Sequence, residues 1–207
     1  MLPKNQLIII GAGGHGKVVL STALACNKTV LGFIDNDQTI HHTELNDYPV
    51  LGDIDFIHRN QHAYAVLAIG HNATRKNIAI QLSPDLKSPA LIHPAAYVHP
   101  SAQIGCGTVV FAGAVIQPDV IIGEHCIINT GTTVDHDCVI GNFVHLAPGV
   151  HLAGNIIVKE GAFLGIGSVV IPNTLIGAWA IVGAGSVVIK PVPPDLTVMG
   201  VPAKEFA

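Results

Sequence analysis

The residues best suited to chemistry form a short polar run, Asp135-His136-Asp137, inside a stretch of aliphatic and small residues. A histidine near its ordinary pKa of about 6.5 suits a general base at neutral pH. An adjacent carboxylate favours the protonated imidazole and so increases its basicity. The run predicts a histidine base with an acid beside it. A polar corner that only contacts water would use the same residue types, and the pattern alone leaves both interpretations open.

A second candidate site is the glycine-rich segment Gly11-Ala12-Gly13-Gly14-His15-Gly16, which follows the apolar run 7–10 and precedes a helix predicted to end near residue 25. It satisfies the pattern G-x-G-x-x-G between a strand and a helix. Such glycines let backbone amides at a helix N-terminus approach an anionic phosphate. A tight structural turn would require them equally, so the phosphate site stays a hypothesis.

Two further polar positions support a ligand site in this part of the chain. Asp35 follows the predicted strand 30–34 and lies 24 residues after Gly11, near the place where an acid meets a ribose or base in dinucleotide-binding folds. Gly70 follows the predicted strand 64–69, and open α/β sheets bind ligands at the carboxyl ends of their strands. With a third strand near residue 50 and helices at 54–59 and 73–82, we predict a small Rossmann-like parallel sheet of four strands.

The element that must position His136 is a repeat, because an aliphatic residue occupies every sixth position from 92 to 188 without insertion or deletion. Such hexapeptides predict a parallel β-helix in which residues 18 apart stack at about 4.8 Å. His136 lies two residues after the inward Val134, so we expect its ring outside the core, at a corner between Pro118 and Gly154. Glycines directly after six of the aliphatic residues are predicted to relieve the backbone at the bends.

The two patterns divide the chain into an α/β domain, residues 1–88, and a β-helix domain, residues 89–207. The segment 83–89 is the predicted linker, and the tail 198–204 is predicted to cover the last coil, whose strand edges would otherwise stay unpaired.

Composition excludes several classes of function. The net charge of −4 and the pI near 6.3 argue against a nucleic-acid binder. Charges or turn formers interrupt every apolar run before membrane length, and no signal peptide is evident, so we expect a cytoplasmic protein. The four cysteines lack CxxC spacing and are predicted to be buried neutral thiols. His145 and His151 should point outward from different walls, which argues against a metal site within one subunit and leaves one across an interface open.

Four segments, 11–17, 70–76, 135–138 and 200–204, together with the hexapeptides between them, resemble the sugar-nucleotide acyltransferases of the left-handed β-helix superfamily. The most similar branch is the acetyl-CoA-dependent N-acetyltransferases that act on UDP-4-amino-4,6-dideoxy-N-acetylglucosamine in bacillosamine synthesis, giving a UDP-N,N'-diacetylbacillosamine type of product. A branch of sialic-acid O-acetyltransferases shares the layout. The resemblance implies an α/β domain before a left-handed parallel β-helix, a homotrimer with active sites between adjacent subunits, acetyl-CoA as co-substrate, and no metal.

The resemblance also assigns residues. It implies that His136 is the general base and Asp137 the acid that tunes it, with direct transfer in a ternary complex. The implied nucleotide-sugar positions are Gly13, Gly14, His15, Asp35, Asn36 and Gly70, and the implied acetyl-CoA positions are His145, Gly154, Ile166, Gly183 and Ala184. The chain departs from some relatives at Asn36 (Asp), Asp137 (Glu) and Ala184 (Gly). Rival functions are O-acetylation of a sialic acid or another sugar, a γ-class carbonic anhydrase-like zinc enzyme, and a non-catalytic binding β-helix.

Overall fold

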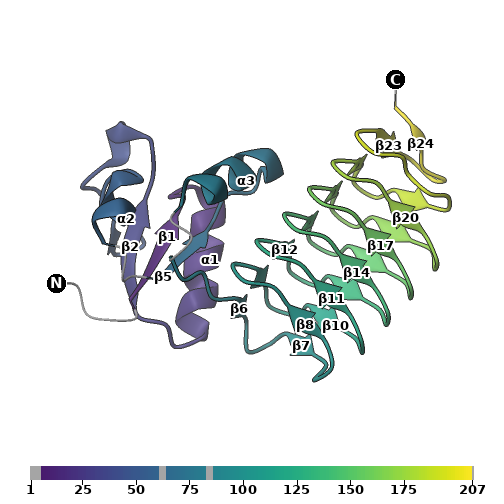
Figure 1. Cartoon of the computed structure of the whole chain (residues 1–207), viewed down its shortest axis with the longest axis horizontal. Helices are drawn as coiled ribbons and strands as arrows, with labels where there is room; N and C mark the ends of the chain where they lie inside the picture. Colours follow the sequence, from purple (N-terminus) through teal and green to yellow (C-terminus); the bar gives the residue numbers. More distant parts are fainter. Residues whose placement is uncertain (1–5, 61–63, 83–85, 207) are drawn as a thin grey trace. The chain divides into compact units, whose positions relative to one another are not determined.

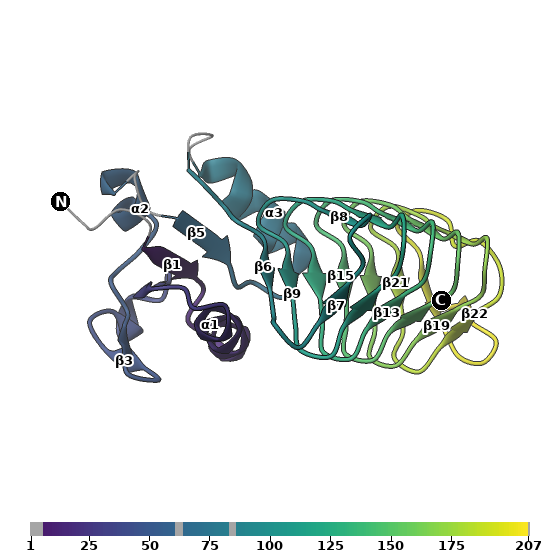
Figure 2. The same cartoon turned by 90° about the horizontal axis from the view of Figure 1, so that it is seen from below.

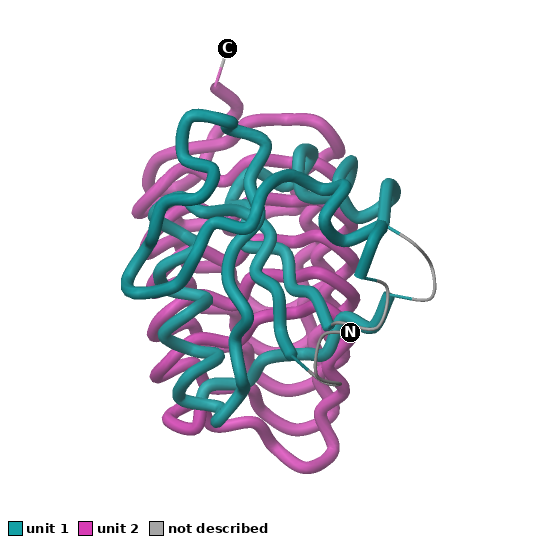
Figure 3. Tube along the Cα trace, turned by 90° about the vertical axis from the view of Figure 1, so that its left-hand side faces the viewer, with its two compact units in different colours: residues 1–93 teal, residues 94–207 magenta. Residues whose placement is uncertain are grey.

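The computed structural model of the protein describes residues 6–60, 64–82 and 86–206. The chain forms two compact units, residues 1–93 and 94–207 (Figure 3). The division falls after the predicted boundary at 88/89, because β6 (Leu91–Ile92) packs with the first unit: the Cys26 Sγ donates a hydrogen bond to the carbonyl oxygen of Ile92 at 3.0 Å. Residues 83–85, the start of the predicted linker, lie outside the described residues.

The first unit is built on a three-stranded parallel sheet of order β2-β1-β5 (Figure 1). Its strands are β1 (Leu7–Ile10), β2 (Val30–Ile34) and β5 (Tyr64–Leu67), and its helices are α1 (Gly14–Ala25), α2 (Asp55–Arg59) and α3 (Asn72–Gln81). All four residues of the central β1 are buried, as expected for a parallel sheet whose strands read as continuous aliphatic runs. The predicted α/β class is confirmed.

The predicted fourth strand near Val50 is wrong. Val50 makes only an isolated bridge to Phe33. The segment before it instead forms a small antiparallel hairpin of β3 (Glu44–Leu45) and β4 (Tyr48–Pro49), after the short 3₁₀ helix η1 (Gln38–Ile40). The Val50 amide donates to the Thr43 carbonyl at 2.8 Å, so the hairpin takes the hydrogen bonds that a fourth strand would need.

The second unit is a three-walled prism of short parallel strands, seen along its stacked coils in Figure 2. The first wall contains β7 (Tyr97–Val98), β10 (Val115–Ile116), β13 (Thr133–Val134), β16 (His151–Leu152), β19 (Val169–Val170) and β22 (Val187–Val188). The second wall contains β8 (Gln103–Ile104), β11 (Ile121–Ile122), β14 (Val139–Ile140), β17 (Ile157–Val158) and β20 (Leu175–Ile176). The third wall contains β9 (Val109–Val110), β12 (Ile127–Ile128), β15 (His145–Leu146), β18 (Phe163–Leu164), β21 (Ile181–Val182), β23 (Thr197–Met199) and β24 (Lys204–Glu205).

The register within the walls confirms the hexapeptide prediction. Residues 18 apart pair directly, as in Ile116 with Val134 and Leu146 with Leu164. The second residue of each strand from β9 to β22 is buried in one column of aliphatic side chains, apart from the tail that completes the end. The first member of the repeat, Ile92, is exposed instead, because it lies in β6, which packs with the first unit. The tail covers the last coil as predicted: β23 pairs with β21, and β24 returns antiparallel to β23.

The explanation predicted for the glycines after the aliphatic residues is wrong. None of these glycines has a left-handed backbone; a Cβ on Gly141, for example, would lie 2.7 Å from the backbone nitrogen of Glu160 on the next coil. They are glycines because stacked coils approach closely there. The left-handed backbone falls three residues after each aliphatic, at positions such as Asp119 (φ 60°), Asp137 (φ 59°) and Asn155 (φ 59°). Asp and Asn tolerate this conformation better than most residues.

The cysteines agree with their prediction only in part. Cys126 and Cys138 are buried, but Cys106 is exposed. None of the three helices, all of which lie within the described ranges, is long and apolar enough to cross a membrane.

Candidate functional site

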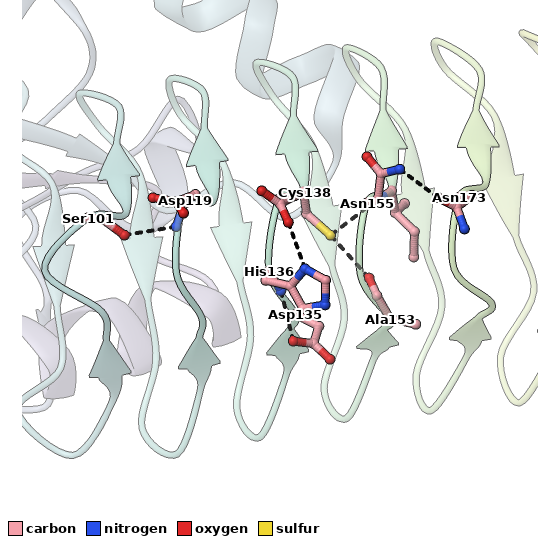
Figure 4. A network of polar contacts seen from close by, with 10 residues as sticks. Ser101, Asp119, Asp135, His136, Cys138, Ala153, Asn155 and Asn173 are labelled. Atoms are coloured by element: carbon pink, nitrogen blue, oxygen red, sulfur yellow. Dashed lines mark hydrogen bonds and ion pairs between the residues drawn. The ribbon is translucent and has the colours of Figure 1, made fainter.

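The polar run lies at the corner between β13 and β14, where the chain turns from the first wall to the second. The His136 ring lies outside the hydrophobic core, as predicted, and its side chain is 58% exposed. Its Nδ1 lies 2.7 Å from the Asp137 Oδ2 (Figure 4). The Asp135 carboxylate accepts a hydrogen bond from the His136 backbone amide at 2.8 Å. The corner therefore holds an accessible imidazole between two acids.

The charges at this corner raise the pKa of His136. The largest cause is the hydrogen bond to Asp137, and the negative charges of Asp135 and Asp137 add to it against a small opposing effect of burial. When Nδ1 carries the proton shared with the carboxylate, Nε2 keeps a lone pair. The pair is thus arranged to accept a proton at Nε2, which confirms the predicted effect of the acid on the base.

Asp137 differs from the residues that stack above and below it. In this column of left-handed corner residues, the Asp119 amide binds the Ser101 hydroxyl on the previous coil, and Asn155 binds Asn173 on the next coil through their side chains (Figure 4). Asp137 instead directs its carboxylate to the neighbouring histidine. On this coil, a side chain that elsewhere connects coils is used to hold an imidazole.

The glycine-rich loop joins β1 to α1, with Gly13 as the N-cap of the helix. Gly11 and Gly16 are required by packing, since a Cβ on Gly11 (φ +111°) would lie 2.8 Å from the Ala68 oxygen and one on Gly16 would meet the Gly11 oxygen. Nothing lies within 4 Å of a Cβ placed on Gly13 or Gly14. No side chain caps this helix, so its first amides are oriented toward an open space, as an anion site requires.

A pocket of about 190 Å³ opens beside this loop in the first unit. It is lined by Ile10, Gly11, Ile34, Asp35, Asn36, Ile54, Ile69, Thr74 and Ile78. The aliphatic walls suit a flat ring, and the two polar side chains at the end of β2 supply hydrogen bonds. The predicted residues Asp35 and Asn36 are therefore brought together at one cavity.

Asp35 also organises the loop. Its Oδ2 accepts a hydrogen bond from the Ala12 amide at 2.8 Å, and its Oδ1 accepts one from the Asp37 amide at 3.0 Å. The carboxylate thus joins the loop after β1 to the loop after β2. Each oxygen keeps a second lone pair with which to accept from a ligand.

Arg75, which the sequence did not single out, holds the third loop of this site. It is 1% exposed, and its guanidinium donates to the carbonyl oxygen of Ile69 at 2.8 Å and to the Asn72 side chain at 2.9 Å. It also contacts the carbonyl oxygen of the predicted residue Gly70 at 3.3 Å. Burial, and next the charge of Arg75, lower the pKa of His15 to about 4. His15 is therefore neutral at physiological pH.

The predicted acetyl-CoA positions do not meet within one chain. Ile166 and Ala184 lie 18 residues apart at the corner between the third and first walls, and both are exposed. Gly183 packs beneath the tail, with the position of a Cβ only 2.8 Å from the Met199 Cβ. Gly154 lies at the other corner, beside His136.

His145 lies outside the core on the third wall, yet its side chain is buried, with 9% exposed. Its ring packs edge-on against Phe163 at 5.2 Å, and Nε2 lies 3.4 Å from the Asn129 amide nitrogen. His151, on the first wall, is exposed and hydrogen-bonded to Thr133. Among the described residues, no group of three or more His, Cys, Asp or Glu side chains is placed to hold a metal ion.

A parallel β-helix preceded by a small α/β unit, with a histidine–acid pair at a helix corner, is the architecture of sugar-nucleotide acyltransferases. Comparison with known families agrees: residues 6–82 match the PglD N-terminal domain, and residues 101–136 match the bacterial transferase hexapeptide repeats. A curated relative, the UDP-N-acetylbacillosamine N-acetyltransferase of Bacillus subtilis, is 42% identical over 112 residues. That match spans about half of each protein, 52% of this chain and 52% of the relative.

Solved structures match over nearly the whole length. PerB from Caulobacter crescentus, in complex with CoA and GDP-perosamine, is 40% identical with a TM-score of 0.93, and the match covers all of both chains. The acetyltransferase domain of PglB from Neisseria gonorrhoeae, in complex with acetyl coenzyme A, is 38% identical with a TM-score of 0.91, covering 99% of this chain and 100% of that one. The chain belongs to the sugar-nucleotide acetyltransferases of the left-handed β-helix superfamily.

Proposed function

We propose that the protein transfers the acetyl group of acetyl-CoA to the amino group of a nucleotide-linked 4-amino-4,6-dideoxy sugar, with His136 as the general base. As a member of its family it is an acyltransferase with acetyl-CoA as co-substrate. The observation that carries the assignment of the base is the 2.7 Å contact between His136 and Asp137 at an exposed corner. Relatives act on UDP-linked and GDP-linked amino sugars; we take the UDP-linked N-acetylated hexosamine as the first candidate.

The proposed chemistry is direct transfer in a ternary complex. The sugar amine attacks the thioester carbonyl, a C–N bond forms as the C–S bond breaks, and CoA leaves as a thiolate. His136 Nε2 takes the proton that the amine loses and can return it to the departing thiolate, so protons balance. Backbone amides would stabilise the oxyanion.

No covalent acyl-enzyme is needed. Cys138, the thiol nearest in sequence to the base, is buried, and its Sγ donates a hydrogen bond to the Ala153 oxygen at 3.1 Å. Burial raises its pKa, which reduces its thiolate fraction and hence its nucleophilicity.

In the first unit, we assign the nucleotide to the open loop and the adjacent pocket. Gly13, Gly14 and neutral His15 would approach the diphosphate, since their amides lie at an uncapped helix N-terminus. Asp35 and Asn36 would bind the ribose or base at the pocket, with Gly70 on the neighbouring loop. Asn36 offers both a donor and an acceptor to a nucleobase edge.

We infer that the protein works as a homotrimer with acetyl-CoA bound between subunits, near His145, Gly154, Ile166, Gly183 and Ala184. These residues occupy different corners and walls of one prism, so neighbouring copies are needed to complete a site. An exposed column of aliphatic side chains on the second wall supports such packing: Ile121, Val139, Ile157 and Leu175 are 44%, 41%, 39% and 39% exposed. Both proposed substrates are metabolites of the cytoplasm, which supports the location predicted from the sequence.

The deciding experiment is incubation of the purified protein with acetyl-CoA and a panel of UDP- and GDP-linked 4-amino sugars, with release of CoA and product mass as readouts. Sialic acid and other hydroxy sugars form the second part of the panel. We expect N-acetylation of a nucleotide-linked amino sugar. His136→Ala should lower turnover roughly 10²–10⁴-fold, while His151→Ala, another exposed histidine, should not. Acetylation of hydroxy sugars alone would reassign the protein to O-acetylation, and unchanged turnover in His136→Ala would remove the base.

A further inference from the structure

Gly154 and His136 face each other on adjacent coils, where the histidine ring occupies the space that a side chain on residue 154 would fill. A Cβ built on Gly154 would lie 2.6 Å from Cε1, 2.7 Å from Nε2 and 3.2 Å from Nδ1 of the ring. Real Cβ atoms do not approach other atoms so closely. The ring and a methyl group at position 154 therefore exclude each other.

The equivalent corner position on other coils shows that the backbone there does not require glycine. At intervals of 18 residues this column contains Pro118, His136, Gly154 and Pro172. The carbonyl oxygens of Pro118, His136 and Gly154 each accept the same hydrogen bond from the next coil, at 3.2, 2.9 and 3.2 Å. Gly154 does not have a left-handed backbone. The one glycine in the column lies directly beside the one histidine.

We propose that Gly154 is a positioning residue for the general base, because its missing side chain allows the His136 ring to lie against the next coil with Nδ1 on Asp137 and Nε2 open to substrate. This inference rests on the proposed role of His136 and gives Gly154 a function apart from any backbone contact with acetyl-CoA. A methyl group at 154 would force the ring to rotate, since the ring is the free end of a side chain and the coil is not. Rotation would break the 2.7 Å contact with Asp137, and the methyl group would cover Nε2.

The test is Gly154→Ala, with Pro172→Ala as the matched control in the same column one coil further on. The first readout is the titration of the His136 imidazole by NMR, which needs no substrate. We expect the pKa of His136 to fall in Gly154→Ala and to stay unchanged in Pro172→Ala, because the Asp137 hydrogen bond is the main cause of its elevation. The second readout is kinetic: kcat should fall at least about tenfold in Gly154→Ala, with little change in the KM for the nucleotide sugar.

Two outcomes would overturn the proposal. An unchanged His136 titration together with an unchanged kcat would show that the ring tolerates the methyl group. A rise in the KM for acetyl-CoA alone would assign Gly154 to the co-substrate. If the wild-type protein acetylates no amino sugar, the proposed function fails, but the titration still tests the positioning of the ring.

A stability measurement covers the case in which Gly154→Ala folds poorly. If the clash with the ring is the cause, the double variant His136→Ala/Gly154→Ala should recover the melting temperature of His136→Ala, since the coupling between contacting residues is lost with one partner. If the double variant stays destabilised, glycine is required by the backbone and the proposal is wrong.

Discussion

The Nδ1 of His136 lies 2.7 Å from the Oδ2 of Asp137 although the two residues are adjacent in the chain. Adjacent side chains in an extended strand point to opposite faces and do not meet in this way. The left-handed backbone of Asp137, with φ of 59°, turns its carboxylate back toward the ring. The base and its acid are therefore set by the geometry of one corner.

Replacement of the acid by its amide, Asp137→Asn, should weaken the base. Asp137 raises the pKa of His136 mainly through its hydrogen bond, so the variant's histidine should lose its proton at lower pH. The acid limb of the profile of kcat/KM against pH should then move to lower pH, while the plateau falls by about tenfold or more. Steady-state kinetics between pH 5 and about 9 measure both effects.

Asp137→Glu is the control for charge, because it keeps a carboxylate one methylene further out. Its acid limb should stay closer to that of the wild-type enzyme than the limb of Asp137→Asn does. An acid limb that does not move in Asp137→Asn would contradict the role of Asp137 as the tuning acid.

The glycine loop gives a paired prediction. Gly14→Ala places a methyl group in open space at the first turn of α1, so stability should be kept while the KM for the nucleotide sugar rises about tenfold through obstruction of the diphosphate. Gly11→Ala should instead lower the free energy of unfolding by roughly 1–3 kcal/mol, because Gly11 has φ of +111° and no room for a Cβ. Urea unfolding and substrate titration separate the two effects. An unchanged KM in Gly14→Ala would move the diphosphate away from this loop.

The period of the hydrophobic pattern was sufficient to predict the prism, because a buried column with one aliphatic residue in six fits no helix and no simple strand pair. It also placed His136 at an outer corner, two residues after Val134. What the pattern missed depends on contacts between coils. The close approach at Gly141 and the exposed thiol of Cys106 follow from the three-dimensional stacking of unlike residues, which a one-dimensional period does not contain.

The site was predicted less completely than the fold. Motif spacing identified Asp35 and the glycine loop, and the cavity brings them together. Arg75 was missed because it lies in a helix with no motif, and only burial and its three backbone and side-chain acceptors reveal its role. The signal for Gly154 was present in the sequence, since it is the residue after His136 in a column that has proline on the flanking coils. Its meaning required the position of the ring.

The neutral state of His15 predicts a dependence of stability on pH. Its pKa is lowered to about 4 by burial and by Arg75, so between about pH 6.5 and 4 the unfolded chain binds a proton that the folded chain does not. Folding stability is therefore lost as pH falls through this window, by about 2 kcal/mol from this residue between pH 7 and 5. His15→Gln should lose less stability than the wild-type protein over the same interval in urea unfolding. Equal losses in both proteins would show that His15 does not titrate abnormally.

The exposed aliphatic column on the second wall makes the last prediction, which concerns assembly. Ile157 lies in the middle of this column, between Val139 and Leu175, with which it pairs in the stacked strands. Ile157→Lys would place a charge within an apolar contact between copies, where burying it without a partner is costly. We expect the variant to shift in light scattering from three times the chain's 21.6 kDa toward the monomer, and acetyl transfer to fall with it because each site needs a neighbouring subunit. Ile80→Lys, at an aliphatic residue in α3 that is 70% exposed, is the control and should remain a trimer. A wild-type protein that is monomeric and active would refute the shared site, and a trimeric Ile157→Lys would place the interface on another wall.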